Sequence, residues 1–230
     1  TSPSVRPLSE RVGSLRHLVE TVNACALPGC TLKYEPFMET MWYAVRRGYV
    51  PHESACFVAH GCRHGFNPGI DCDHQALQGH RWFANYKSAL MNAAAVSKAI
   101  ASRVACAKTV DLGEWSDSLA ADVRDCFDHS RIFPMGCVAK KGTTDMRPTS
   151  DHSRTGVNAA TSLEFFRHML SALGDVCWYA QQGHFLAVSD VADAYLTIPL
   201  HPDVWQYFMS RFDASGTGKV HLYMHLFGDF

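Results

Sequence analysis

Apolar residues recur every three or four positions in three stretches of the chain, a spacing that predicts amphipathic helices. The first stretch follows Pro7, and its apolar stripe is Leu8, Val12, Leu15, Val19 and Val22. The second, residues 81–107, contains neither Gly nor Pro, so we expect one long helix there. The third covers residues 115–127, where every fourth residue is apolar. In residues 23–80 Gly, Pro, His and Cys interrupt the pattern, which predicts loops around one or two short helices.

Shorter apolar runs bounded by turn residues predict strands in the second half of the chain. Residues 132–139 contain Pro134 and Gly136, which indicates an irregular edge strand. A turn at 141–145 and a returning strand over 146–151 follow it, so these residues are expected to form a hairpin.

The remaining elements are one helix and three strands. Residues 161–164 read Thr-Ser-Leu-Glu, a capping-box pattern that begins a helix, and the next glycine is well placed to end it. Residues 185–190 predict a short strand that ends on a carboxylate. Residues 205–212 and 220–227 predict two strands joined by a loop at 213–218.

The order of these elements indicates the fold class. Helices precede strands without regular alternation, which is typical of an α+β fold. Residues 1–130 are predicted to form a mainly helical N-terminal region, and residues 131–230 a part richer in strands. A chain of 230 residues is long enough for one sizeable domain or two small ones that share a surface.

The composition describes an ordinary globular protein. Hydrophobic residues make up 47% of the chain and charged residues 19%, unlike disordered or fibrous chains. No apolar stretch has the length of a membrane span and the start has no signal pattern, so we expect an intracellular protein, in the cytoplasm or nucleus, without a membrane partner. The nine cysteines are scattered through apolar segments, which favours reduced thiols. The net charge of −1 would not by itself suggest a nucleic-acid enzyme.

The segment from Ala187 to Leu200 carries most of the functional information. Asp190 ends an apolar strand, where a carboxylate is held rigidly at the edge of a sheet. Proteins commonly bind Mg²⁺ through one or two such carboxylates, with phosphate oxygens at other positions. Two-metal phosphoryl transfer requires a group of this kind. A helix N-cap after a strand is the simpler interpretation of an isolated Asp.

Residues 190–195, Asp-Val-Ala-Asp-Ala-Tyr, followed by Ile-Pro-Leu-His-Pro at 198–202, resemble motif A of retroelement reverse transcriptases. The resemblance implies that Asp190 binds both catalytic metals, Mg²⁺ or Mn²⁺, together with the backbone carbonyl of Val191. It makes Tyr195 the steric gate, a rigid ring that leaves no room for a 2′-hydroxyl group and so selects deoxynucleotides. The same resemblance places Asp193 and Ala194 beside the bound nucleotide. Asp193 equally fits a first-turn carboxylate stabilised by the helix dipole.

A second resemblance to the same family lies upstream. Residues 133–141 and 146–158 are similar to its fingers hairpin, which carries a Lys near the turn and an Arg before a short strand. Carried over, these are Lys140 or Lys141, between which spacing does not choose, and Arg147. They would close over a triphosphate and neutralise its charge, the Arg in a planar, bidentate manner. A solvated hairpin charge is the alternative for each of them.

A third resemblance lies in residues 222–228, which are similar to the start of motif B, where the family often has Leu-Pro-Phe-Gly. It implies that Phe227 packs near the incoming sugar and that Gly228 lets the backbone approach it. The sequence departs from the motif in two places, with Leu226 where Pro is usual and Asp229 after the Gly.

The resemblance implies a right-hand polymerase fold, present as the fingers and the start of the palm over residues 131–230. The implied activity is RNA-directed addition of deoxynucleotides to a primer 3′-hydroxyl, with template-primer (RNA or DNA) and dNTP as partners. In gypsy-like or tyrosine-recombinase-type retrotransposons, further palm, thumb, RNase H or recombinase domains follow. The family's third motif, an aromatic before two adjacent aspartates, does not occur in this sequence, so we expect an incomplete fragment, inactive by itself. The alternative is a non-catalytic, polymerase-like relic or a nucleic-acid-binding module.

Three other groups of residues have a possible chemical role. A set of potential zinc ligands is Cys56, His60, Cys62, His64, Cys72 and His74. Their irregular spacing favours thiols and histidines without a metal. Asp151, His152 and Ser153 have the side chains of a hydrolase triad, but adjacent strand residues point to opposite faces, so Asp151 is expected to be structural. Trp205 and Tyr207 could stack bases, although core packing is favoured.

Overall fold

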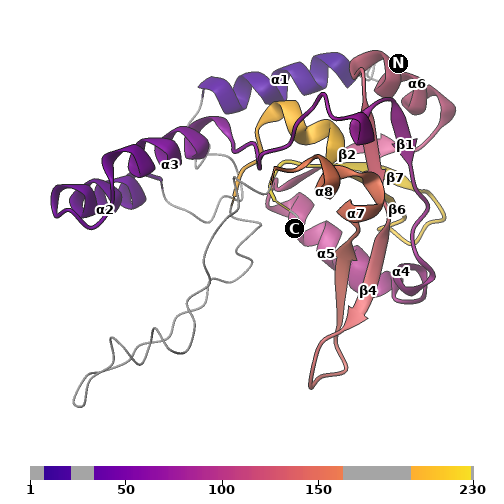
Figure 1. The fold of residues 1–230 in the computed structure, drawn as a ribbon. Coiled ribbons are helices and arrows are strands. Elements are labelled where there is room, and N and C mark those ends of the chain that lie inside the picture. The colour runs from indigo at the N-terminus through magenta and orange to yellow at the C-terminus, as the bar shows by residue number, and fades with distance from the viewer. Residues whose placement is uncertain (1–7, 22–33, 163–197, 229–230) are drawn as a thin grey trace, which may run out of the picture.

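The structure is a computed structural model that describes residues 8–21, 34–162 and 198–228 (Figure 1). Its helices are α1 (Leu8–Thr21), α2 (Tyr34–Arg46), α3 (His52–His64), α4 (Lys87–Met91), α5 (Ala93–Ala105), α6 (Asp117–Cys126), α7 (His152–Thr155) and α8 (Val157–Ala160). Two 3₁₀ turns are η2 (Gln75–Leu77) and η5 (Pro202–Tyr207). The strands are β1 (His80–Trp82), β2 (Thr109–Glu114), β3 (Ser130–Phe133), β4 (Met135–Ala139), β5 (Met146–Ser150), β6 (Met209–Phe212) and β7 (His221–His225).

A mixed sheet forms the centre of the molecule, with strand order β1-β3-β6-β7-β2. The β1–β3 and β3–β6 pairs are parallel, and the β6–β7 and β7–β2 pairs are antiparallel. This arrangement confirms the predicted α+β class. The sheet takes β1 and β2 from residues before 130 and the other strands from residues after it.

Helices cover both faces of this sheet (Figure 1). Successive strand residues point to opposite faces, so neighbouring residues of β7 enter different cores. Leu222 and Met224 pack in one buried cluster with Leu119 and Val123 of α6. Tyr223, between them, packs in a second cluster with buried side chains of α5. The α6 face and the α5 face of the sheet are therefore opposite faces.

Strands β4 and β5 form the predicted hairpin, which projects from the body of the molecule (Figure 1). The predicted edge strand over 132–139 is wrong as a single element, because β3 belongs to the central sheet and β4 to the hairpin. Pro134 separates them. Proline has no N–H group to donate, and its carbonyl accepts the N–H of Asp151 (3.2 Å), which closes the base of the hairpin.

The long helix predicted over 81–107 is also wrong in its first part. Arg81 and Trp82 belong to β1, where parallel pairing with β3 overrides the helical spacing. The remainder is divided into α4 and α5 at Asn92, whose backbone is not helical (φ −116°, ψ 37°). Its side-chain amide donates to the carbonyl oxygen of Ser88 (2.8 Å), a local bond of the kind that competes with helix continuation.

Two further predictions need correction. Residues 34–64 form two helices, longer than the short ones expected. Gly48 and Gly65, which have positive φ (73° and 88°), follow the ends of these helices, and Gly61 is accommodated inside α3. The strand predicted over 205–212 begins only at Met209, and η5 precedes it. The predicted helix from Thr161 continues outside the described residues, as does the whole strand predicted over 185–190.

The rings of Trp205 and Tyr207 are fully buried, which confirms core packing and leaves neither available for base stacking. The indole Nε1 of Trp205 donates to the carbonyl oxygen of Leu200 (2.9 Å). In the part of the chain that the structure describes, no helix is long and apolar enough to cross a membrane.

Candidate functional site

The basic residues of the hairpin lie where the sequence predicted them. Lys140 and Lys141 are exposed at the turn, and Arg147 is exposed on β5 opposite Val138. The turn is closed by the N–H of Lys140, which donates to the carbonyl oxygen of Asp145 (2.9 Å). Three cationic side chains near the free end of a two-stranded ribbon could approach an anion from solvent without losing any packed contact.

The base of the hairpin is fixed by polar groups from residues 85–88. The side-chain Oδ1 of Asn85 accepts the N–H of Met135 (2.9 Å), while its Nδ2 donates to the carbonyl oxygen of Arg211 (2.6 Å). Ser88 Oγ accepts the N–H of Cys137 (3.1 Å). One asparagine therefore joins β4 to β6, and the hairpin is held at its base while its turn is free.

A tyrosine and a carboxylate fix the chain after the hairpin. The hydroxyl of Tyr86 donates to Asp151 Oδ2 (2.5 Å), and Asp151 Oδ1 accepts the N–H of Arg154 (2.9 Å), which caps α7. The hydrogen bond from Tyr86 is the main cause that lowers the pKa of Asp151, and the N–H groups of Arg154 and Ser153 add to it. These contacts give Asp151 the structural role expected from the sequence.

The three residues 151–153 do not converge as a hydrolase triad. The ring of His152 is buried, with its centroid 4.8 Å from that of Phe133 and 5.1 Å from that of Phe208. Ser153 is exposed, and its Oγ accepts the side-chain amide of Asn158 (2.8 Å).

The segments that follow motif A and begin motif B lie side by side. The N–H of Leu200 donates to the carbonyl oxygen of Leu226 (2.8 Å), and the N–H of Gly228 donates to that of Ile198 (2.9 Å). Pro199 and Phe227 form the bridge between these two bonds. Residues 198–200 and 226–228 are therefore antiparallel neighbours.

Residues 66–71 hold this region from the other side. The N–H of Phe66 donates to the carbonyl oxygen of Pro199 (2.8 Å), and the N–H of His201 donates to that of Phe66 (3.0 Å). Nearby, the N–H of Ser162 donates to the carbonyl oxygen of Gly69 (2.9 Å). The chain on both sides of residues 163–197 is thus bound to one short stretch.

The structure places only part of the predicted nucleotide site. Phe227 is fully buried in the core, and its contact with a sugar remains a prediction. Gly228 is buried and bound through its backbone. The other predicted site residues lie outside the described residues: Asp190, Val191, Asp193, Ala194 and Tyr195. The residues that would hold Mg²⁺ are among these.

The cysteines and histidines of residues 56–74 are not gathered into one group in the described part of the chain. Cys56 is exposed and Cys62 is buried, although both lie on α3. The rings of His60 and His64 lie side by side on the same helix, with centroids 4.6 Å apart. Within the described ranges, no group of three or more His, Cys, Asp or Glu side chains could hold a metal ion.

Sequence analysis did not identify Arg131, a fully buried arginine of β3. Its guanidinium donates to five backbone carbonyl oxygens, those of Ala76 (2.7 Å), Gln78 (3.1 Å), Gly79 (2.6 Å), Ser130 (2.7 Å) and Thr155 (3.0 Å). Burial lowers its pKa. One feature of the sequence could have indicated this role: Arg131 is a charged residue in the short strand 130–133, whose other residues are also buried. Arg131 ties η2 and the end of α7 to the sheet.

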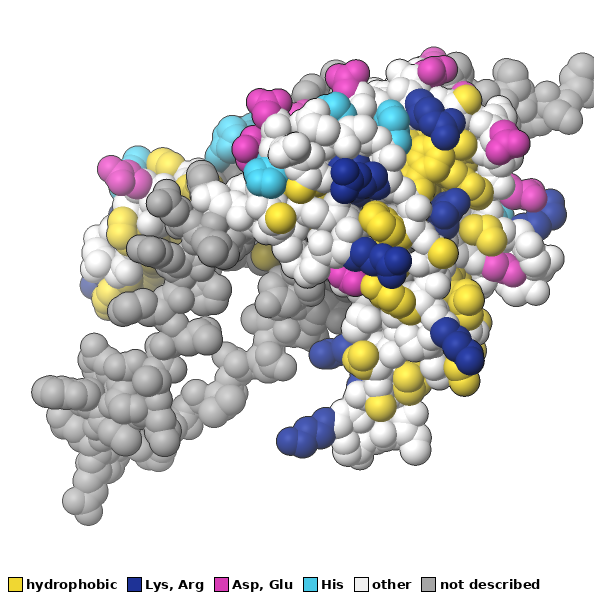
Figure 2. All heavy atoms as spheres, turned by 45° about the vertical axis from the view of Figure 1, so that its right-hand side comes forward, with side chains coloured by type: hydrophobic (Ala, Val, Ile, Leu, Met, Phe, Trp, Pro, Cys, Tyr) yellow, Lys and Arg dark blue, Asp and Glu magenta, His cyan; other side chains and the backbone are white. Residues whose placement is uncertain are grey.

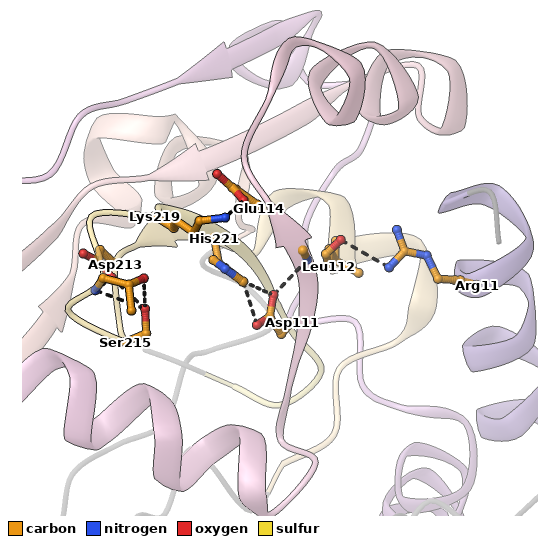
Figure 3. A network of polar contacts seen from close by, with 10 residues as sticks. Arg11, Asp111, Leu112, Glu114, Asp213, Ser215, Lys219 and His221 are labelled. Carbon is orange, nitrogen blue, oxygen red and sulfur yellow. Dashed lines mark hydrogen bonds and ion pairs between the residues drawn. The ribbon is translucent and has the colours of Figure 1, made fainter. Parts of the chain in front are cut away.

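Polar contacts also fix the opposite edge of the sheet (Figure 3). The Nδ1 of His221 lies 2.9 Å from Asp111 Oδ2, and Lys219 pairs with Glu114 (2.8 Å) across β2 and β7. Arg11 of α1 donates to the carbonyl oxygen of Leu112 (3.2 Å). These groups pair with one another, which indicates a structural role for this edge.

Comparison with known proteins adds no assignment to this geometry. No protein family matches the chain, and no curated protein matches it either. The arrangement of the hairpin and of residues 198–200 beside 226–228 is the basis of the functional proposal.

Proposed function

We propose that the chain forms the fingers and the first part of the palm of a right-hand polymerase, and that its parent activity is RNA-directed addition of deoxynucleotides to a primer 3′-hydroxyl. One observation carries the proposal: residues 198–200, in the stretch that resembles motif A, pair with residues 226–228, at the end of the stretch that resembles the start of motif B. Two segments chosen from sequence alone, and far apart along it, are neighbours in space.

The proposal requires Tyr195 to reach the backbone of Gly228. Tyr195 is three residues from Ile198, and a chain spans at most about 3.6 Å per residue. The carbonyl oxygen of Ile198 accepts the N–H of Gly228 (2.9 Å). The chain from Tyr195 to Ile198 is therefore short enough for Tyr195 and Gly228 to contact the same nucleotide.

The residues of the hairpin would act on the triphosphate. Arg147 and a lysine, Lys140 or Lys141, would neutralise its charge, and positioning with charge stabilisation accounts for most of the rate of such reactions. Mg²⁺ or Mn²⁺ bound by Asp190 and the Val191 carbonyl would supply the Lewis acid. A hairpin fixed at its base and free at its turn is suited to close over a ligand and reopen.

Primer extension on an RNA template in the presence of Mg²⁺ tests the proposal. The protein should be the longest uninterrupted product of the parent gene, because the 230-residue sequence has no adjacent pair of aspartates. We expect extension that Asp190→Ala abolishes and that Asp122→Asn, an exposed carboxylate on α6, leaves intact. Absence of extension by the folded protein, or extension that survives Asp190→Ala, would reject the enzyme.

A non-catalytic protein that keeps the polymerase fold is the second candidate. The burial of Phe227 favours it, because the ring assigned to the sugar is packed in the core. This candidate predicts a folded protein that binds nucleic acid and does not extend a primer, with or without Asp190.

A further inference from the structure

Four side chains from different elements form a stacked column on the α6 face of the sheet. The guanidinium of Arg124 lies over the ring of Trp82, 4.5 Å from its centroid. Trp82 meets Trp115 edge to face, with centroids 5.1 Å apart. The guanidinium of Arg211 lies over Trp115 at 4.6 Å. We call Arg124, Trp82, Trp115 and Arg211 the arginine–tryptophan column.

The column is accessible and its arginines are without carboxylate partners. Arg124 is exposed, and Trp82, Trp115 and Arg211 are partly exposed. Among the described residues, neither Arg124 nor Arg211 forms an ion pair with Asp or Glu. Stacking uses the face of a guanidinium and leaves its N–H groups, which lie in the plane, free to bind an anion in a bidentate manner.

The charges around the column are mixed. Residues 75–110, which include Trp82, contain five Lys or Arg and no Asp or Glu, although Lys98 and Arg103 lie on α5, on the opposite face of the sheet. Residues 111–128, which include Trp115 and Arg124, contain six Asp or Glu and one Arg. Burial lowers the pKa of His80, on the strand that carries Trp82, and the charges of Arg124, His129 and Arg131 lower it further. On the face drawn in Figure 2, Lys and Arg side chains alternate with hydrophobic ones, and Asp and Glu side chains are also present, mainly towards the upper and right-hand edges.

A similar combination occurs near α7. The guanidinium of Arg154 lies 5.4 Å from the ring centroid of Phe83 and 5.5 Å from that of Tyr86. Tyr86 also contacts the base of the hairpin, because its N–H donates to the carbonyl oxygen of Met135 (2.9 Å). A cation stacked on aromatic rings is therefore also present beside the base of the hairpin.

We propose that the arginine–tryptophan column binds single-stranded nucleic acid, with phosphates on Arg124 and Arg211 and bases against the exposed parts of Trp82 and Trp115. Single-strand binders combine basic grooves with aromatic rings in this way. An acidic peptide would pair with Arg124 and Arg211, but its carboxylates would not stack on the rings of Trp82 and Trp115. The choice of nucleic acid rests on the proposed polymerase function, to which the column adds a contact outside the nucleotide site.

Fluorescence anisotropy with labelled oligo(dT) and oligo(U) of about 20 nucleotides tests the column. The full chain is used without Mg²⁺ or dNTP, so the readout does not depend on catalysis. We expect Arg124→Gln to weaken binding about fivefold or more and to reduce the slope of log Kd against log salt by about one. Lys98→Gln removes the same charge from α5, on the opposite face of the sheet, and should leave Kd unchanged.

Three outcomes would overturn the proposal. They are no binding at low salt, equal effects of Arg124→Gln and Lys98→Gln, and equal displacement of the oligonucleotide by polyglutamate of matched charge, which would indicate an acidic protein partner. Among the described residues, no hydrogen bond of the Arg124 side chain is found, so Arg124→Gln is expected to fold. An unchanged circular dichroism spectrum of the variant would exclude unfolding. If the oligonucleotide binds and Arg124→Gln weakens binding, but no primer is extended, the polymerase proposal is rejected and the column proposal stands. If primers are extended but Arg124→Gln does not change binding, the column proposal is rejected and the polymerase proposal stands.

Discussion

At the scale of single residues, Arg131 makes the most demanding contacts in the described structure. A buried cation normally needs a carboxylate, and this one is neutralised only by the dipoles of five carbonyl groups. The gain from these bonds is offset by desolvation, so their net contribution is modest while all are present. Removal of the guanidinium would leave several buried carbonyl oxygens without a donor.

We therefore expect Arg131→Met to lower the free energy of unfolding by about 3 kcal/mol or more. Arg81→Met, at the exposed β1 position that pairs with Arg131, should change stability by less than about 0.5 kcal/mol. Urea unfolding of the two variants measures the difference. If Arg131→Met and Arg81→Met have equal free energies of unfolding, water must satisfy the five carbonyl oxygens as well as the guanidinium does.

Asp151 gives a prediction about acid. Its pKa is lowered from the ordinary 3.8 by the Tyr86 hydroxyl and backbone N–H groups, so the folded state binds its proton less tightly than the unfolded state. The stability from this carboxylate is present above about pH 3.8 and is lost as pH falls through the folded-state pKa. Asp151→Asn keeps a capping oxygen and removes the titration.

The wild type should thus be more stable than Asp151→Asn at pH 7, and the difference should shrink by pH 3. Unfolding free energies at the two pH values test this, with Asp122→Asn as a control for loss of an exposed carboxylate. A stability gap that stays constant between the two pH values would contradict a role for the ionised form.

At the scale of elements, the side chain of Asn85 joins the hairpin to β6 of the sheet. Asn85→Ala removes both the acceptor for Met135 and the donor to Arg211, at a cost of about 1–3 kcal/mol. We expect amide exchange of β4 to accelerate more than that of β7. Asn158→Ala, which removes one exposed contact to Ser153, is the matched control. Uniform acceleration in all strands would show that the asparagine stabilises the whole fold and not the hairpin.

The elements also show which sequence signals were sufficient. Local patterns predicted α1, α6 and the β4–β5 hairpin, because their apolar spacing and turn residues agree with their packing. The pattern failed at β1, where pairing with a strand about 50 residues away overrides helical spacing. It failed again at η5, where a buried tryptophan bound to Leu200 fixes a 3₁₀ turn in an apparently alternating run. Long-range partners of this kind are not visible in local periodicity.

At the scale of the whole molecule, the sequence predicted the α+β class but not the composition of the sheet. Strands β1 and β2 join it from a region expected to be mainly helical. For the candidate site, the hairpin cations and residues 226–228 were identified from a resemblance. The column was missed, because Trp82, Trp115, Arg124 and Arg211 share no spacing and meet only after the sheet and α6 have assembled.

The attachment of Ser162 and Pro199 to one stretch fixes both ends of the segment between them. Bonds from Ser162 to Gly69 and from Phe66 to Pro199 close a ring in the chain that contains the 35 residues 163–197. The bonds at both ends are made by backbone groups of residues 66–69, so the places of Ser162 and Pro199 in the fold are set by groups outside residues 163–197.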